Sequence, residues 1–236
     1  MVRRSGNDSS VPFVPGAGPT EVDASDRPER RTEVVDFGGL SIAFDDRVLR
    51  PRPWTVAQSW WAAEILAGAP EGRVLELCSG AGQIGLLAVA SSSRRLVCVD
   101  VDPVACEFSR RNADEAGLSA HVEVRQGTVG EAVPEHEQYA MIIADPPWVP
   151  SRAVATFPGD PPLAIDGGAD GGDLIRECVR VISRALVPGG SAVLQVGSND
   201  QASSVGQRLA SSDVTLTACH ELEGGVLVRL DRPSRP

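Results

Sequence analysis

The sequence lacks lysine. All 22 basic residues are arginine, which excludes a phosphate-loop lysine, a pyridoxal Schiff base and a lysine nucleophile. The five cysteines form no C-x-x-C pair and only three histidines are present, so we expect no metal site. Cys98 and Cys178 lie in apolar segments, where cysteine acts as a small hydrophobic residue, and we expect a reduced, cytoplasmic protein.

Long apolar runs and a basic surplus are also absent. No stretch approaches the roughly 18 apolar residues that a membrane span needs, and Arg3-Arg4 is not followed by the apolar segment of a secretory signal. We therefore expect no membrane association. The net charge of −10 disfavours a nucleic-acid partner, because nucleic acid is itself densely negative.

Secondary-structure signals divide the 236 residues into three parts. Residues 1–32 are rich in Ser, Pro, Gly, Asp and Arg without an apolar period, which predicts a disordered tail. Residues 33–55 predict a β-hairpin with a Gly38-Gly39 turn, followed by an extended, proline-rich leading segment. Residues 56–236 predict one α/β domain.

Strands and helices alternate in this domain, which predicts a mostly parallel sheet with helices on both faces. Thr55 and Gln58 predict a capping box, Asp102-Pro103 predicts a helix start, and Pro188-Gly189-Gly190 predicts a helix stop. The predicted strands are Val74–Leu77, Leu96–Val99, Val122–Arg125, Met141–Ala144, Ala192–Val196, Val214–Ala218 and Val226–Leu230. The predicted helices after the first are Gly82–Ala90, Pro103–Ala116 and Asp173–Leu186.

A glycine-rich turn, Gly80-Ala81-Gly82-Gln83-Ile84-Gly85, joins the strand at Val74–Leu77 to a helix. Glycines there let the backbone approach a ligand closely, and the helix N-terminus offers free N–H groups. Asp100 ends the next strand, 20 residues beyond Gly80, where a carboxylate can bind both hydroxyls of a ribose. The pattern predicts a nucleotide-like cofactor.

Two cofactors compete for this turn, and a turn without any ligand is a third interpretation. The pattern G-x-G-x-x-G is also the fingerprint of NAD-binding proteins. Glu76, however, lies in the strand just before the turn. A carboxylate there repels the pyrophosphate of NAD but attracts the sulfonium and ammonium groups of S-adenosylmethionine (SAM), which we therefore favour.

The motif Asp145-Pro146-Pro147-Trp148 follows the buried strand Met141–Ala144. Ligands of open α/β sheets lie beyond the carboxyl ends of strands, so Asp145 should share the crevice of the glycine turn. The prolines remove two N–H donors, leaving the Asp145 carboxylate and the Pro146 carbonyl to hold an NH₂ group. Trp148 offers a flat face or a cation–π contact. An Asp-Pro-Pro turn with a packed tryptophan is the alternative.

These motifs resemble class I SAM-dependent methyltransferases, and among them the HemK/PrmC-like glutamine N5-methyltransferases with a methyltransferase small domain. The resemblance covers about residues 33 to 200. Val48–Thr55 is similar to the family's V-L-I-P-R-P-E-T, Asp145–Trp148 to N-P-P-Y, and Leu163–Leu174 to A-L-x-G-G-x-D-G-L-D. The resemblance implies a Rossmann-like, seven-stranded, mostly parallel sheet of order 3-2-1-4-5-7-6 with helices on both faces, preceded by a short β-hairpin.

The resemblance also assigns roles to residues. SAM would contact a set that runs along the carboxyl ends of the strands: Glu76, Cys78, Ser79, Gly80, Ala81, Gly82, Asp100, Val101, Thr128, Val129 and Asp145. The acceptor would bind Asp145, Pro146, Pro147 and Trp148, with Asp145, Pro146 and Trp148 catalytic. The sequence departs from the family at four of the matched positions, with Asp145 for Asn, Trp148 for Tyr, Trp54 for Glu and Thr128 for Asp. The family's helical N-terminal domain is not recognisable before the core.

We expect a SAM-dependent N-methyltransferase that acts on a small molecule or an exposed peptide group. An ordinary aspartate is ionised at neutral pH, so Asp145 favours an amine, aniline or ring amino group over an amide. The main alternative is glutamine N5-methylation of a release factor. Adenine-N6 methylation, an NAD-binding oxidoreductase and an inactive SAM-binding protein are further alternatives.

The composition of the tail makes a first prediction. Deleting residues 1–32 should leave the melting temperature of the core unchanged, because such segments contribute few buried contacts. Scanning calorimetry of the truncated chain measures this directly. A large fall in melting temperature would show that the tail packs against the core.

Overall fold

The computed structural model describes residues 31–234. Nearly all of the tail predicted over residues 1–32 therefore lies outside the described residues. Within the described part of the chain, no helix is both long and apolar enough to cross a membrane.

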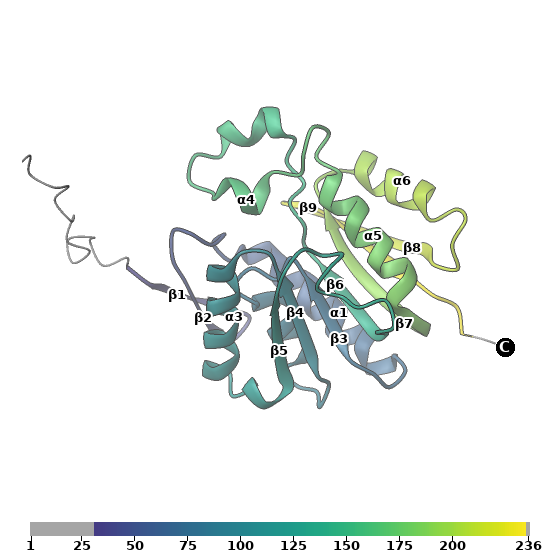
Figure 1. Cartoon of the computed structure of the whole chain (residues 1–236), viewed down its shortest axis with the longest axis horizontal. Helices are drawn as coiled ribbons and strands as arrows, with labels where there is room; N and C mark the ends of the chain where they lie inside the picture. The colour runs from purple at the N-terminus through teal and green to yellow at the C-terminus, as the bar shows by residue number, and fades with distance from the viewer. Residues whose placement is uncertain (1–30, 235–236) are drawn as a thin grey trace, which may run out of the picture. The chain divides into compact units, whose positions relative to one another are not determined.

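A seven-stranded sheet forms the centre of the fold (Figure 1). Across the sheet the strands are β5 (Val122–Gln126), β4 (Leu96–Asp100), β3 (Val74–Leu77), β6 (Tyr139–Ala144), β7 (Leu186–Val196), β9 (Gly225–Asp231) and β8 (Thr215–Leu222). Strands β3 to β7 are parallel, whereas β9 runs antiparallel to both of its neighbours. In chain order this is 3-2-1-4-5-7-6, so the predicted fold class is confirmed.

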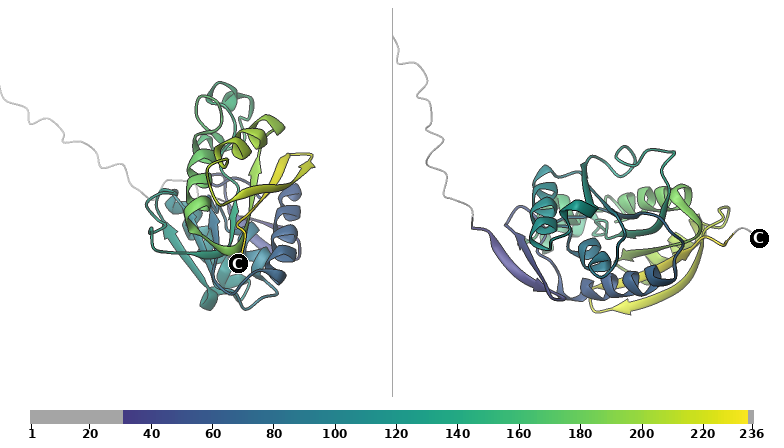
Figure 2. Two further views of the ribbon diagram at one scale, coloured as in Figure 1. Left: turned by 90° about the vertical axis from the view of Figure 1, so that its right-hand side faces the viewer. Right: turned by 90° about the horizontal axis from the view of Figure 1, so that it is seen from below.

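Helices cover both faces of the sheet (Figure 2). One face packs against α1 (Val56–Gly68), α2 (Gln83–Val89) and α3 (Pro103–Glu115), and the other against α5 (Asp173–Ala185) and α6 (Asn199–Arg208). Successive strand residues point to opposite faces, and both faces are covered. The central strands are therefore apolar along their whole length, and Glu76 is the one charged residue inside β3.

A β-hairpin of β1 (Glu33–Phe37) and β2 (Leu40–Phe44) precedes the sheet, as expected. Its turn places Gly38 at φ 62° and Gly39 at φ 97°, a region that disfavours residues with a side chain. The buried amide of Asn112 in α3 accepts a hydrogen bond from Ala43 N–H at 2.8 Å and donates one to Ala43 O at 2.9 Å. The hairpin is thereby fastened to α3.

The chain makes a long excursion between β6 and α5. It contains the 3₁₀ helix η4 (Ser151–Thr156) and the short helix α4 (Pro162–Ile165), and it rises from the carboxyl edge of the sheet (Figure 1). A further 3₁₀ turn, η3 (Ser119–His121), precedes β5 at the opposite edge. The excursion therefore lies on the side where ligands of such sheets bind.

One predicted helix cap is confirmed and another is wrong. The Asp102 carboxylate accepts from the N–H of Val104 at 2.8 Å and caps α3 as expected. The capping box of Thr55 and Gln58 does not form. A 3₁₀ turn, η2 (Pro53–Thr55), leads into α1, and the Thr55 hydroxyl donates to the carbonyl of Arg52 instead.

The helix stop before Pro188-Gly189-Gly190 is confirmed, because α5 ends at Ala185, one residue before the predicted end. The sequence did not predict that these three residues lie within β7. Between the pairs Tyr139–Leu186 and Met141–Ser191 the register of β6 and β7 shifts. Proline and glycine therefore mark a strand bulge as well as the helix end.

Gln58 is fully buried and joins two strands. Its Nε2 donates to the carbonyl of Ala144, the last residue of β6, at 2.9 Å and to that of Val193 in β7 at 3.2 Å. Its Oε1 is buried without a hydrogen-bond partner. Gln58 thus holds the two strands at the position directly before Asp145.

We predict that Gln58→Leu destabilises the fold by about 1–3 kcal/mol, because two buried carbonyls lose their donor. Urea unfolding measures the free energy change. Gln207→Leu, at an exposed position of α6, is the matched control and should change stability by less than about 0.5 kcal/mol. A Gln58→Leu variant as stable as the parent would contradict the structural role of this amide.

Candidate active site

The glycine turn, Cys78–Gly82, connects β3 to α2 in a left-handed backbone conformation. Cys78 lies at φ 56°, Gly80 at φ 53° and Gly82, which precedes the first residue of α2, at φ 80°. A Cβ placed on Gly80 would meet no atom within 4 Å. The turn therefore has open space beside Gly80, where a ligand can approach the backbone.

Two side chains of α3 hold this turn through hydrogen bonds to its carbonyl groups. The Ser109 hydroxyl donates to the carbonyl of Gly80 at 2.8 Å, and the Asn112 amide donates to the carbonyl of Ala81 at 2.9 Å. Both side chains are buried. The buried hydroxyl of Ser79, a predicted SAM contact, has no hydrogen-bond partner among the described residues.

Asp100 lies directly beside the turn, as its spacing predicts. Its Oδ2 accepts from the N–H of Gly80 at 2.7 Å and its Oδ1 from the N–H of Asp102 at 2.9 Å. Burial raises its pKa, and the backbone donors oppose that rise. Each carboxylate oxygen retains a lone pair, so Asp100 can still accept from ribose hydroxyls.

Glu76 is buried beneath the turn and does not open into it. Its Oε1 accepts from the N–H of Gly85 in α2 at 2.9 Å, and its Oε2 accepts from the thiol of Cys98 at 3.4 Å. Burial is the main cause that raises the pKa of Glu76 to about 8; the charges of Asp100 and Asp145 contribute to the rise, and the hydrogen bonds from Gly85 and Cys98 oppose it. Glu76 thus fixes the start of α2 and is largely uncharged at neutral pH.

Asp145 directly follows β6, and its carboxylate makes no hydrogen bond or ion pair within residues 31–234. Its side chain is partly buried, and the loss of hydration raises its pKa to about 7. The ordinary aspartate pKa expected from the sequence is therefore wrong. Near neutral pH, Asp145 exchanges a proton readily and can both accept a hydrogen bond and take up a proton.

The three carboxyl groups share one feature. Glu76, Asp100 and Asp145 end or nearly end β3, β4 and β6, which are neighbours in the sheet. Desolvation is the largest cause of the raised pKa of each, and no cationic side chain of the described chain forms an ion pair with any of them. Asp100 and Asp145 are therefore available to a positively charged ligand at this edge, whereas Glu76 already has partners for both of its oxygens.

The rest of the acceptor motif is held in place by its surroundings. Trp148 lies against Gly197 at the end of β7, where a Cβ would come within 2.3 Å of Cε3 of the indole. The carbonyl of Trp148 accepts from the amide of Gln201 at 3.1 Å. Pro146 is buried and Pro147 partly so. Trp148 thus has a fixed position at the carboxyl edge.

The family-like block at 163–174 folds onto this motif. The N–H of Val149 donates to Ile165 O at 3.0 Å, and the N–H of Gly167 donates to Val149 O at 2.8 Å. The glycines of the block allow close approach, since a Cβ on Gly171 would lie 2.4 Å from Trp148 O. The block therefore supports the acceptor motif from the excursion.

Three of the predicted SAM contacts, Val101, Thr128 and Val129, differ in accessibility. Val101, after β4, is 47% exposed and presents an apolar surface. The Thr128 hydroxyl donates to the carboxylate of Glu131 at 2.7 Å. The side chain of Val129 is buried in the core, so only its backbone could lie along a ligand.

The proline-rich leading segment before α1 contacts both the excursion and the turn between β8 and β9. Arg52 forms an ion pair with Asp160 of the excursion, and its guanidinium lies 5.7 Å from the ring centre of Trp54. Trp54 in turn lies against Gly224 in the turn between β8 and β9, where a Cβ would come within 2.2 Å of the indole nitrogen. Segments far apart in the sequence thus meet around the carboxyl edge.

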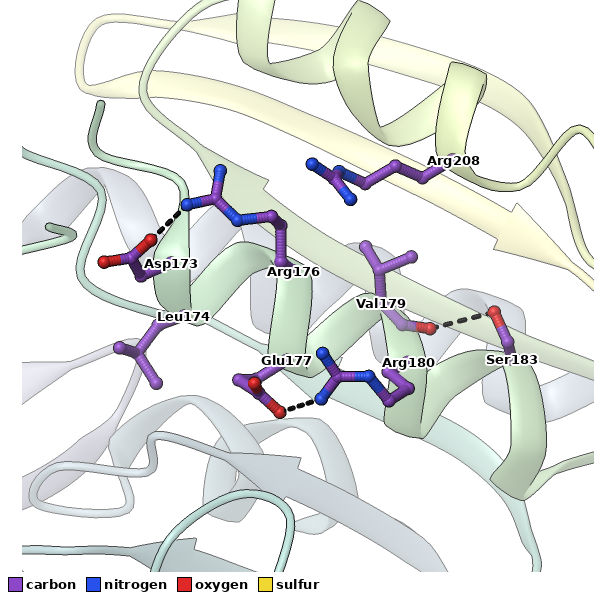
Figure 3. A pocket seen from close by; sticks show the side chains of 8 residues that line it. All are labelled: Asp173, Leu174, Arg176, Glu177, Val179, Arg180, Ser183 and Arg208. Atoms are coloured by element: carbon purple, nitrogen blue, oxygen red, sulfur yellow. Dashed lines mark hydrogen bonds and ion pairs between the residues drawn. The ribbon is translucent and has the colours of Figure 1, made fainter. Parts of the chain in front are cut away.

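A hollow of about 450 Å³ lies between α5 and α6, apart from these groups (Figure 3). Arg176 pairs with Asp173 and Arg180 with Glu177, while Arg208 faces them from α6. None of the predicted cofactor or acceptor residues lines it. Its charges are largely satisfied by one another, and we assign it no part in catalysis.

Sequence reasoning missed the residues that position the site. Gln58, Ser109, Asn112 and Gln201 each donate to backbone carbonyls between 29 and 135 residues away. A local sequence pattern carries no signal for such contacts. Only the polar character of Gln58 and Ser59 within the buried face of α1 could have drawn attention to one of them.

The chain is similar to known proteins in both sequence and fold. The methyltransferase small domain family matches residues 61–157. The chain is 32% identical to the ribosomal protein uL3 glutamine methyltransferase of Bradyrhizobium diazoefficiens, covering 67% of this chain and 54% of that protein. It is 32% identical to the release factor glutamine methyltransferase of Mycolicibacterium smegmatis, covering 80% and 68%. A methyltransferase structure from Pyrococcus furiosus has a TM-score of 0.61 at 16% identity, covering 84% of this chain and 91% of the other.

The chain covers only part of the length of some relatives. It spans 54% of the Bradyrhizobium protein and 60% of the release factor glutamine methyltransferase of Deinococcus radiodurans. The antiparallel β9 between β7 and β8 departs from the 3-2-1-4-5-6 order of dinucleotide-binding domains, so the NAD alternative is set aside. The family match, the 68% of the Mycolicibacterium enzyme that the chain covers, and the strand order all agree. The chain therefore belongs to the HemK/PrmC-like family of class I methyltransferases.

Proposed function

We propose that the chain is a SAM-dependent N-methyltransferase. One observation carries this proposal: two carboxyl groups, Asp100 and Asp145, lie at the carboxyl ends of β4 and β6 without a cationic partner within residues 31–234. SAM brings a sulfonium and an ammonium charge, which such an edge attracts. An anionic pyrophosphate at the same edge would be repelled.

The residues present fit this cofactor. The backbone of Gly80–Gly82 would hold its methionine end, Asp100 its ribose, and the exposed Val101 its adenine. Glu76 would act through its hydrogen bond to Gly85, because both of its oxygens already have partners and its raised pKa leaves it largely uncharged at neutral pH. When bound, SAM supplies an activated methyl group.

Asp145 and the Pro146 carbonyl would orient the acceptor nitrogen. The nitrogen lone pair forms the new bond to the methyl carbon, while the electron pair of the breaking carbon–sulfur bond stays on sulfur. Positive charge develops on the nitrogen, and the adjacent carboxylate stabilises it. The surplus proton of the nitrogen passes to Asp145 and then to water, for which a pKa of about 7 is well matched.

The proposed acceptor is the nitrogen of a small molecule or an exposed peptide group. Glutamine in a protein is the second candidate, because the relatives are named as glutamine methyltransferases of a release factor and of ribosomal protein uL3. Asp145 favours the first candidate. An amide nitrogen is a poor nucleophile that a neutral asparagine suffices to orient, whereas an amine gains from a carboxylate.

Proton release tests the cofactor assignment. Binding of SAM near pH 7 should release protons, because a nearby cation lowers the pKa of Asp145 and Glu76. S-adenosylhomocysteine lacks the sulfonium charge and should release fewer. Calorimetry in two buffers of different ionisation enthalpy measures the difference. Tight binding of NADH without any binding of SAM would contradict the assignment of SAM as the cofactor.

Substitution of Asp145 tests the chemistry. Asp145→Ala should leave SAM binding largely intact and slow methyl transfer by roughly 10²-fold or more. The parent rate with an amine acceptor should rise with pH through about 7 as Asp145 ionises. Asp145→Asn keeps the shape without the charge, so it should be slower and lose this pH dependence. Equal rates for Asp145→Asn and the parent from about pH 6 to about pH 9 would favour the glutamine candidate.

Unfolding measurements separate chemistry from stability in these variants. A raised carboxyl pKa means that ionisation destabilises the folded state. The stability that Asp145 contributes is present below its unfolded pKa and is lost as pH rises through about 7. Asp145→Asn should therefore be at least as stable as the parent above pH 7. Glu135→Gln, at an exposed position, is the control and should show no such gain.

A further inference from the structure

Two tryptophans lie against neighbouring glycines at the carboxyl edge of the sheet. A Cβ on Gly197 would come within 2.3 Å of Cε3 of Trp148, and a Cβ on Gly224 within 2.2 Å of Nε1 of Trp54. No side chain other than hydrogen fits at either position. Both indoles therefore occupy space that the glycines leave for them.

The two glycine positions are close in space. Val196, the last residue of β7, pairs with Val226 of β9, which places Gly197 beside the turn that holds Gly224 and Gly225. A Cβ on Gly225 would lie 3.7 Å from the Cα of Gly197. Trp54 and Trp148 therefore approach the same corner from the leading segment and from the acceptor motif.

Each indole is held by contacts with neighbouring groups, and Trp148 also packs against the hydrophobic core. Trp148 rests on Gly197 through its six-membered ring, and its carbonyl is held by Gln201. Trp54 rests on Gly224 through its five-membered ring, with the Arg52 guanidinium 5.7 Å from its centre. Both side chains remain partly exposed. The buried Nε1 of Trp54 has no hydrogen-bond partner in the described chain.

We propose, on the basis of the methyltransferase function above, that the acceptor is a planar aromatic or heteroaromatic amine bound by Trp54 and Trp148, with its nitrogen on Asp145. Indole faces stack on flat rings and attract cations. Asp145, three residues before Trp148, supplies the complementary negative charge at the same corner. The side chain of a glutamine acceptor would use little of this aromatic surface.

The identities of Trp54 and Trp148 distinguish this chain from the resembled family, which has glutamate and tyrosine at these positions. Both indoles remain partly exposed, and Trp148 also packs against the core. The corner therefore has more aromatic surface than the family pattern provides.

Paired probes test this assignment without knowledge of the natural acceptor. Benzylamine and cyclohexylmethylamine have the same charge and similar size, and only the first is planar. Calorimetry with the full chain saturated in S-adenosylhomocysteine should show benzylamine binding about tenfold tighter, the scale of one stacking contact. Trp54→Leu and Trp148→Leu should each reduce this preference several-fold.

Matched variants distinguish the effect of lost stacking from the effect of lost folding. Trp60→Leu is the control, because Trp60 lies in the adjacent α1 and is 61% exposed. It should keep the full preference. Trp54→Phe and Trp148→Phe retain an aromatic face and should keep most of it, which shows that a loss in the leucine variants reflects lost stacking.

The outcomes separate this inference from the proposed function. Benzylamine binding no tighter than cyclohexylmethylamine, or a preference unchanged in both leucine variants, overturns the aromatic acceptor. A tighter complex with a glutamine-containing peptide than with benzylamine does the same and leaves the methyltransferase function standing. Failure of the parent chain to bind SAM and S-adenosylhomocysteine overturns the proposed function itself.

Discussion

The site depends on a carboxylate that the protein keeps without a partner. Asp145 directly follows the buried strand β6, its two following prolines offer no N–H, and within residues 31–234 no cation pairs with it. An uncompensated charge in such a place is costly, and the group responds by a raised pKa. A ligand that brings an N–H donor or a positive charge offsets the desolvation of this carboxylate. The same carboxylate would therefore contribute to both ligand binding and catalysis.

The surrounding structure maintains this condition. Gln58 ties the ends of β6 and β7 together just before Asp145, and the 163–174 block packs against the backbone that follows it. Asp100 adds a carboxyl group at the end of β4, and Gly80 leaves open space beside the turn. The edge thus has a cofactor side, rich in backbone donors and carboxylates, and an acceptor side with an unpaired carboxylate and two indoles.

Much of the fold followed from the sequence because its signals are local. Alternating apolar strands and capped helices, such as the one that Asp102 begins, predict a parallel sheet, and the resemblance supplied the strand order. Errors arose where local signals have two meanings. Pro188-Gly189-Gly190 follows the end of α5 but also marks an unpredicted bulge in β7, and Gln58 binds two distant strands instead of capping its own helix. The raised pKa of Asp145 could not be predicted either, because desolvation depends on what the fold brings around the carboxyl group.

Direct titration of Asp145 tests the central claim. The carboxyl carbon of this residue can be followed by ¹³C NMR as the pH is varied, with Asp145→Asn identifying its signal. We predict a pKa of about 7 in the free protein and a lower value when SAM is bound, because the sulfonium charge stabilises the carboxylate. A pKa near the ordinary 3.8 in the free protein, unchanged by SAM, would contradict the account.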